Sequence, residues 1–298
     1  MVISKILDLF SSFFKTNSGA ESITTTTNIS IPLPENNGKI ENKNEFNLTT
    51  IPDRNINAPT GSKFISDNLN LRGSARESNV LKEFLSGNIP DFLRTLIPVT
   101  VTNQSNSITY YVMPDYLSIG TDDDYCRMPM LAKTGKKIAD LYGCILPTKK
   151  MVDDIYKNAT IKLNAKPYGP PYDGNSMSGT ARFDWSNQTI QKQLVGKENG
   201  SLVAGHKKDI VVTKSLLNNK NNIAIYGWYL NGIPIQGPQP NASSHDLLWI
   251  DYSQCIRLIS QKVIVNGEEK NIYDVLNDIN LCKLISDVGN FNARNIYK

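Results

Sequence analysis

The sequence predicts an α+β domain built on a mainly antiparallel sheet with flanking helices, preceded by a disordered tether and an amphipathic N-terminal helix. Helical and strand patterns are mixed along the chain, without the regular alternation of strand and helix that builds a parallel sheet. The last third is rich in Ile, Val, Trp and Tyr, and Asn266-Gly267 is a strong hairpin-turn signal. Because 40% of the 298 residues are hydrophobic and 20% are charged, the chain can bury a core.

Residues 1–16 are predicted to form an amphipathic docking helix. Its apolar stripe consists of Ile3, Ile6, Leu7, Phe10, Phe13 and Phe14. There is no clear signal peptide, because Lys5 is the only basic residue before the apolar stretch and Asp8 interrupts it. We expect this helix to bind a larger protein assembly or a membrane surface. Two alternatives for this segment remain open, a cleaved signal and a helix packed on its own domain. The localisation is also open, and the candidates are export and association with an assembly.

Residues 17–60 are predicted to be a flexible tether, and residues 61–298 a globular α+β domain. Nineteen of the 44 tether residues are Ser, Thr or Asn, and only a few are apolar. Such a segment cannot bury enough surface to offset the entropy lost on ordering. A docking helix joined to a domain by a tether is typical of attachment, in which the domain works at a distance from its anchor.

Periodicity and turn signals predict the elements of the domain in order. Helices are expected at 77–86, 91–96, 131–142, 148–159, 188–195 and 272–285. Strands are expected at 99–102, 108–113, 209–213, 222–229, 247–251, 256–260 and 262–265. Thr148 is the expected N-cap of its helix, the strands 99–102 and 108–113 form a predicted hairpin, and the Pro- and Gly-rich residues 164–182 form a predicted loop.

Charge and cysteine content exclude several classes of protein. Lys and Arg number 32 and Asp and Glu 28, and a net charge of +4 is too small to indicate a nucleic-acid binder. No run of about 18 apolar residues predicts a membrane-spanning helix. The four cysteines, Cys126, Cys144, Cys255 and Cys282, lack the close pairing of a zinc knuckle. We expect buried free thiols, and two disulfides remain an alternative.

The only two histidines each lie in a polar loop near an aspartate, just before a predicted strand. His206 precedes Asp209, and His245 precedes Asp251. Adjacent antiparallel strands would bring both loops to one edge of the sheet. An Asp that orients a His can carry out general acid–base catalysis, so these four residues are the predicted catalytic set. The alternative is that two unrelated histidines occupy surface loops.

The same residues suggest that the protein holds a divalent metal as a cofactor, and zinc is the candidate. Two His and one Asp can hold zinc, and the predicted ligands are His206, Asp209 and His245. Ser253 is a further candidate as a nucleophile, with either His as its base, although no Gly-x-Ser-x-Gly elbow surrounds it.

Two other patterns suggest ligands. Asp122, Asp123 and Asp124 form the sharpest acidic feature and suggest either a cation site or a solvated turn. Aromatic faces stack on sugars, and the predicted glycan-binding residues are Tyr226, Trp228 and Trp249. These three are also ordinary core or sheet-pairing residues, which is the alternative.

Several strings together resemble a family of uncharacterised bacterial proteins. They are 205–212 (Gly-His-Lys-Lys-Asp-Ile-Val-Val), 224–228 (Ala-Ile-Tyr-Gly-Trp), 250–253 (Ile-Asp-Tyr-Ser), 256–258 (Ile-Arg-Leu), 113–117 (Met-Pro-Asp-Tyr-Leu), 120–124 and 146–148. The resemblance covers roughly residues 75–260. It implies a His after Asp-Tyr-Ser, where this chain has Gln254, so a site that used this His would be weakened here. A looser likeness to zinc peptidases of the bacterial cell wall exists, but their His–Asp spacing is not met.

These patterns predict a hydrolase-like domain that acts on a bacterial cell-envelope polymer through a His/Asp site. One alternative is a non-enzymatic cargo or structural component, tethered to a larger assembly such as a phage particle or a contractile injection machine. Another alternative is a glycan-binding module. Metal analysis of the purified domain would separate the first hypothesis from the other two.

Overall fold

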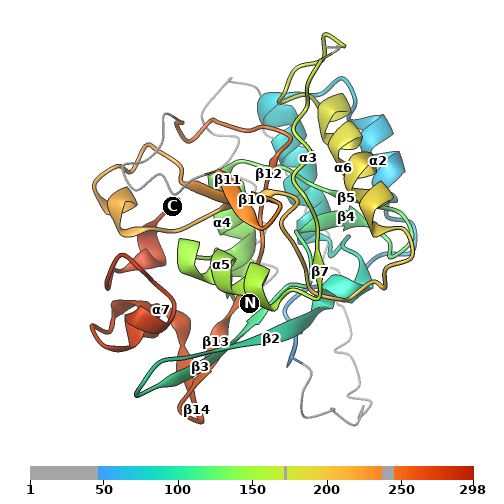
Figure 1. Cartoon of the computed structure of the whole chain (residues 1–298). Helices are drawn as coiled ribbons and strands as arrows, with labels where there is room; N and C mark the ends of the chain where they lie inside the picture. The colour runs from blue at the N-terminus through green and yellow to red at the C-terminus, as the bar shows by residue number, and fades with distance from the viewer. Residues whose placement is uncertain (1–45, 171–172, 237–244) are drawn as a thin grey trace, which may run out of the picture. The chain divides into compact units, whose positions relative to one another are not determined.

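The computed structural model describes residues 46–170, 173–236 and 245–298, which fall within one compact unit, 42–298 (Figure 1). Its elements confirm the predicted α+β class with mainly antiparallel sheets. The predicted docking helix, 1–16, and most of the predicted tether lie outside the described residues. No helix among the described residues is long and apolar enough to cross a membrane.

Residues 46–60 were predicted to belong to the tether, and the structure corrects this. Strand β1 (Phe46–Asn47) pairs with β2 (Thr95–Thr102), and Leu48 and Ile51 are buried in the core. These few apolar side chains are enough to fix the segment because each has a preformed core surface to cover. The composition of the whole stretch from 17 to 60 conceals this local signal.

The larger sheet has the strand order β1-β2-β3-β13-β14, and β6 also pairs with β13. The remaining bounds are Ser107–Val112 for β3, Ile259–Val265 for β13, Glu268–Asn271 for β14 and Cys144–Ile145 for β6. Both predicted hairpins are confirmed, namely β2–β3 and β13–β14. Asn266 and Gly267 connect β13 to β14 with φ angles of 52° and 87°, the left-handed conformation that Asn and Gly adopt most readily.

The second sheet carries the residues that the sequence singled out, in the order β11-β10-β9-β12. Its strands are β9 (Lys208–Ile210), β10 (Ile225–Leu230), β11 (Ile233–Gln236) and β12 (Gln254–Cys255). Strand β12 runs parallel to β9, and the other pairs are antiparallel. Two further pairs complete the strands, antiparallel β4 (Ser118–Gly120) with β5 (Tyr125–Arg127) and parallel β7 (Ile161–Lys162) with β8 (Val203–Ala204).

Helices flank these sheets, and Figure 1 shows α2, α3 and α6 near one another on one side. The α-helices are α2 (Gly61–Asp67), α3 (Gly73–Leu85), α4 (Ala132–Leu141), α5 (Lys149–Asn158), α6 (Thr180–Leu194) and α7 (Ile272–Asn277). Short 3₁₀ turns lie at Asp91–Arg94, Lys214–Leu217, Leu281–Leu284 and Ala293–Asn295. Thr148 caps α5 as predicted, because its side chain accepts a hydrogen bond from the backbone N–H of Met151.

Several predicted elements differ from the structure, and three of the differences bear on the account. Helix α6 begins at Thr180, within the predicted loop, and not at 188. The predicted strand 247–251 is a turn, in which Leu248 is 76% exposed. The predicted helix 272–285 is interrupted because the carboxylate of Asp278 accepts hydrogen bonds from the N–H groups of Asn280 and Leu281, which starts a new turn.

One continuous apolar core joins the helices and the two larger sheets, but several large charged side chains lie inside the protein. The four cysteines are free and buried, as predicted. The largest fully buried side chains include Arg76, Arg127, Arg182, Arg257 and Lys207. A buried charge must be paired or hydrogen-bonded, so these residues indicate where the fold is most constrained.

Candidate functional site

The four predicted catalytic residues separate into two groups. His206 and Asp209 point into a buried polar cluster, whereas His245 and Asp251 belong to a cluster of aromatic and charged side chains nearer the surface. Among the described residues, no three His, Cys, Asp or Glu side chains are grouped so that they could hold a metal ion. The predicted ligand set His206, Asp209 and His245 is therefore not assembled.

The buried polar cluster is centred on the carboxylate of Asp115. Arg127 donates to Asp115 Oδ2 from Nη2 at 2.5 Å and from Nε at 3.0 Å. His206 Nε2 lies 3.0 Å from Asp115 Oδ1, and the N–H of Tyr116 donates to the same oxygen at 2.6 Å. Both oxygens of this carboxylate are thus fully used within the protein.

A second carboxylate, Asp209, lies on the other side of Tyr116. The Tyr116 hydroxyl donates to Asp209 Oδ2 at 2.7 Å, and Arg257 Nε lies 3.8 Å from Asp209 Oδ1. The guanidinium of Arg257 covers the Tyr116 ring at 4.2 Å and donates to the carbonyl of Val203 at 2.7 Å. The cluster thereby connects the segment after β3, the end of β8, strand β9 and the segment before β13.

Burial and pairing set the charges of this cluster. Burial alone would raise the pKa of Asp115, but Arg127 holds it well below its usual range, and His206 makes a smaller contribution in the same direction. Burial lowers the pKa of His206 to about 4, more than the neighbouring Asp115 can raise it. Burial likewise raises the pKa of Asp209 to about 6, against the effect of Arg257. At neutral pH the cluster therefore contains a neutral imidazole beside a paired carboxylate.

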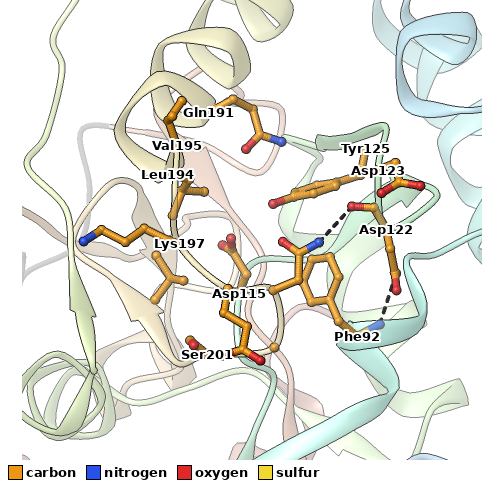
Figure 2. Close-up of a pocket in the computed structure, with 14 residues that line it drawn as sticks. Phe92, Asp115, Asp122, Asp123, Tyr125, Gln191, Leu194, Val195, Lys197 and Ser201 are labelled. Carbon is orange, nitrogen blue, oxygen red and sulfur yellow. Dashed lines mark hydrogen bonds between the residues drawn. The ribbon is translucent and has the colours of Figure 1, made fainter.

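A polar pocket of about 380 Å³ opens in front of Asp115 (Figure 2). Its lining includes Asp122, Asp123, Lys197 and Glu198. The N–H of Phe92 donates to Asp122 Oδ1 at 3.2 Å, and Asn199 donates to the Asp122 carbonyl at 3.0 Å; Figure 2 draws both bonds.

The three neighbouring aspartates Asp122, Asp123 and Asp124 do not point to one place in the structure. Asp124 turns away from the pocket, where its carboxylate accepts from the N–H and the hydroxyl of Ser62, each at 2.9 Å, at the start of α2. Because the three carboxylates do not converge, they do not form the cation site that was one of the two interpretations. Asp124 instead stabilises the first turn of a helix.

Trp228 lies on β10 in an unusual backbone conformation. Its φ is 58° and that of Gly227 is 102°, both in the left-handed region, so the backbone departs from regular strand conformation here although the pairing register with β9 and β11 does not shift. The indole is half-buried, Lys208 Nζ lies 4.7 Å from its ring centre, and the ring of Tyr252 approaches it at 6.2 Å. A Trp at positive φ costs roughly 1–3 kcal/mol, and such strain is concentrated at functional sites.

Trp228 is one end of a row that we call the aromatic cluster, formed by Trp228, Tyr252, Trp185 and Tyr168. Tyr252 meets Trp185 edge-on at 5.8 Å, and Trp185 meets Tyr168 edge-on at 5.0 Å. The Tyr252 hydroxyl accepts from the N–H of Tyr168 at 2.7 Å. Arg182 covers the Tyr168 ring at 3.3 Å, so the far end of the row also carries a cation.

Two predicted residues, His245 and Asp251, extend this cluster. Asp251 lies 3.6 Å from Lys208, the same lysine that covers Trp228. His245 stacks on Trp249 at 3.7 Å, and Trp249 is 38% exposed. Burial lowers the pKa of His245, with Asp251 and Lys208 acting in opposite directions.

Tyr226 does not belong to the aromatic surface and was wrongly assigned to it. Its ring is buried, and its hydroxyl donates to Asp153 Oδ1 at 2.7 Å, together with the hydroxyl of Tyr229 at the same distance. Residues two apart on a regular strand share a face, and the positive φ angles of Gly227 and Trp228 break this alternation, which explains the error. Tyr226 therefore joins β10 to helix α5.

Ser253 and Gln254 are both buried. The Ser253 hydroxyl donates to Asp251, so its proton is held by a carboxylate and not by a histidine. Gln254 donates weakly to the carbonyls of Met130 and Trp249, at 3.4 and 3.3 Å, and its own side-chain oxygen has no hydrogen-bond partner. A buried acceptor without a partner is costly, which indicates that glutamine fits this position poorly.

The sequence reasoning missed the residues that organise both clusters. Asp115, Tyr116 and Arg257 lie inside the strings on which the family resemblance rests, but none was singled out. Their signal was available, because polar and charged residues within apolar strings such as 113–117 and 256–258 are typical of buried pairs. Trp185 carried no such signal, since it lies between the predicted loop 164–182 and the predicted helix 188–195.

Comparison with protein-family models, with curated proteins and with solved structures finds no match to this chain. The family resemblance therefore stays a prediction.

Proposed function

We propose that the protein binds a glycan polymer through the aromatic cluster, and that the polymer is of the bacterial cell-envelope type. The observation that carries the proposal is Trp228, a large aromatic residue that the fold keeps in a strained conformation at a half-exposed position. Packing alone would be satisfied by a smaller residue, or by glycine, without this strain.

The chemistry around Trp228 suits a sugar chain. Sugar rings present C–H faces that stack on aromatic rings, and hydroxyl groups that need both donors and acceptors. Lys208 supplies a donor and Asp251 an acceptor beside Trp228. A row of aromatic residues interleaved with charged groups matches an extended chain better than a single small molecule.

The buried polar cluster supports a different role for His206 and Asp209. Both side chains are enclosed, and their hydrogen bonds hold four segments of the chain together. The hydrolase hypothesis assigned catalysis to these groups, whereas their position favours a structural role. The cargo hypothesis depends on residues 1–16, which lie outside the described residues, and stays a prediction.

A sedimentation assay with insoluble peptidoglycan tests the proposal. The full chain is expected to sediment with the polymer, and Trp228→Gly is expected to weaken this binding at least about tenfold, the effect of removing a central aromatic contact. Leu230→Ala is the matched control, because Leu230 is exposed on the same strand and should leave binding unchanged. A wild-type protein that stays in the supernatant with peptidoglycan, chitin and cellulose alike would refute the proposal.

A further inference from the structure

A lysine and a serine meet beneath the aromatic cluster. Lys207 is 1% exposed, and its Nζ lies 3.0 Å from Oγ of Ser186 and donates to the carbonyl of Tyr252. Ser186 lies on α6, next to Trp185, and is 6% exposed. Both partners are therefore fixed by residues that adjoin the aromatic cluster.

The surroundings of Lys207 favour its neutral form. Among the described residues, no carboxylate lies within 4.0 Å of its Nζ, so an ammonium there would have no ion pair. Burial lowers the pKa of Lys207, and Arg127 lowers it further, while the thiols of Cys126 and Cys255 and the more distant Asp251 act in the opposite direction. Both thiols are themselves protonated, because burial raises their pKa to about 12 and about 11.

A neutral amine at this position has the hydrogen-bond geometry of a general base. It has two N–H donors and one lone pair, and the Tyr252 carbonyl accepts from one N–H. In the structure Nζ donates to Ser186 Oγ at 3.0 Å, and rotation of the neutral amine about its Cε–Nζ bond would turn the lone pair to the hydroxyl proton of Ser186. Pairs of serine and lysine act as nucleophile and base in several unrelated hydrolases.

We propose that Ser186 and Lys207 form a nucleophile–base pair that cleaves acyl esters carried by a glycan bound on the aromatic cluster. Only the substrate class rests on the proposed function. The sequence did not single out either residue, and Ser186 fell between the predicted loop 164–182 and the predicted helix 188–195.

The reaction proceeds in two balanced halves. Ser186 Oγ bonds to the ester carbonyl carbon while Nζ of Lys207 takes the hydroxyl proton, and the C–O bond to the sugar breaks as the sugar oxygen receives that proton. Water then attacks the acyl-serine, Nζ takes one proton of the water, and the Ser186 oxygen recovers it on release of the carboxylic acid. No oxidant or other co-reactant is needed.

Covalent labelling of the full chain with a fluorophosphonate tests the pair without any glycan. The serine oxygen bonds to phosphorus and fluoride leaves, so one adduct is expected by intact mass, at Ser186 by peptide mapping. Ser186→Ala should abolish the adduct, and Ser118→Ala is the control, because Ser118 is also a buried serine and its hydroxyl donates to a carbonyl and not to a lysine. No adduct at Ser186, or an adduct that survives Ser186→Ala, would overturn the proposal.

The role of Lys207 has its own readouts. Lys207→Met should slow labelling by at least about 100-fold, the contribution of a general base. Because this variant can fail to fold, the pH profile of the wild type provides a second measurement: the labelling rate should rise with pH and level off below 10.4, the ordinary pKa of lysine. A rate that keeps rising past that pH would remove the lysine from the mechanism. Peptidoglycan binding is measured separately on the unlabelled wild type, so labelling at Ser186 without binding would refute only the proposed function.

Discussion

The buried polar cluster and the aromatic cluster use adjacent residues of one strand, β9, in opposite directions. Asp209 points inward to the hydroxyl of Tyr116, and Lys208 points outward over Trp228. The inner cluster is enclosed and its charges are paired, whereas the outer one is partly exposed at Trp228, Trp185 and Tyr168 and is strained at Trp228. Residues that are neighbours in a motif can thus serve different purposes, one the stability of the fold and the other the binding of a ligand.

The largest expected effect lies in the inner cluster, at Arg127. Arg127→Met removes the partner of Asp115 and leaves an uncompensated buried carboxylate. We expect a loss of about 3–5 kcal/mol in the free energy of unfolding, measured by urea denaturation. Lys63→Met is the control, because Lys63 pairs with Asp67 on the surface, where the effect should stay within about 0.5 kcal/mol. Equal effects of the two substitutions would contradict the structural role of the cluster.

His206 should make stability depend on pH in the acid range. Its pKa is about 4 in the folded protein and 6.5 as the ordinary value, so the unfolded chain binds the extra proton first. The associated stability is complete above pH 6.5 and is lost as the pH falls towards 4, by about 3 kcal/mol in total. His206→Gln should remove this component, whereas the half-buried His245→Gln should change the profile much less. A His206→Gln profile identical to wild type would be inconsistent with a neutral buried imidazole.

The titration of Asp209 should change stability with pH in the opposite sense to that of His206, over an overlapping pH range. Its pKa is raised to about 6 from 3.8, so the folded protein keeps its proton longer, and stability is lost as the pH rises between these values. In the wild type this partly cancels the effect of His206. Asp209→Asn should therefore lose stability more steeply than wild type when the pH is lowered from 6 to 4. Thermal unfolding at a series of pH values measures the difference, and a shallower loss would show that Asp209 is ionised throughout.

The smallest effect on stability is expected in the aromatic cluster, at Trp228. Trp228→Gly removes packing but also relieves the left-handed strain, so the free energy of unfolding should change by no more than about 1 kcal/mol. Peptidoglycan binding should nevertheless fall at least about tenfold. Urea denaturation and sedimentation on the same samples measure both quantities. A large loss of stability would mean that Trp228 is a core residue.

The sequence predicted the class of fold and most helices because their signals are local. Thr148 as a cap and Asn266-Gly267 as a turn act on their immediate neighbours, and both predictions are confirmed. The start of α6 was missed because no side chain caps it at Gly179, and its first turn depends on contacts with distant segments, such as Arg76 with Thr180.

The candidate site was only partly predictable, for a different reason. Trp228, Trp249, His245 and Asp251 were identified by residue type, but the sequence does not show where positive φ angles, as at Gly227 and Trp228, break the alternation of side chains along a strand. Asp115 and His206 are 91 positions apart in the chain, and their contact depends on the folded arrangement of several strands. A histidine beside an aspartate in sequence was therefore a poor guide to its actual carboxylate partner.

The central claim is that the outer cluster binds a glycan while the inner cluster maintains the fold. Peptidoglycan binding by Trp228→Gly and His206→Gln, compared at neutral pH on samples shown to be folded, tests this claim most directly. The account predicts that Trp228→Gly loses at least about tenfold in affinity, and that His206→Gln stays within about twofold of wild type despite reduced stability. The reverse result, with binding lost in folded His206→Gln and retained in Trp228→Gly, would contradict it.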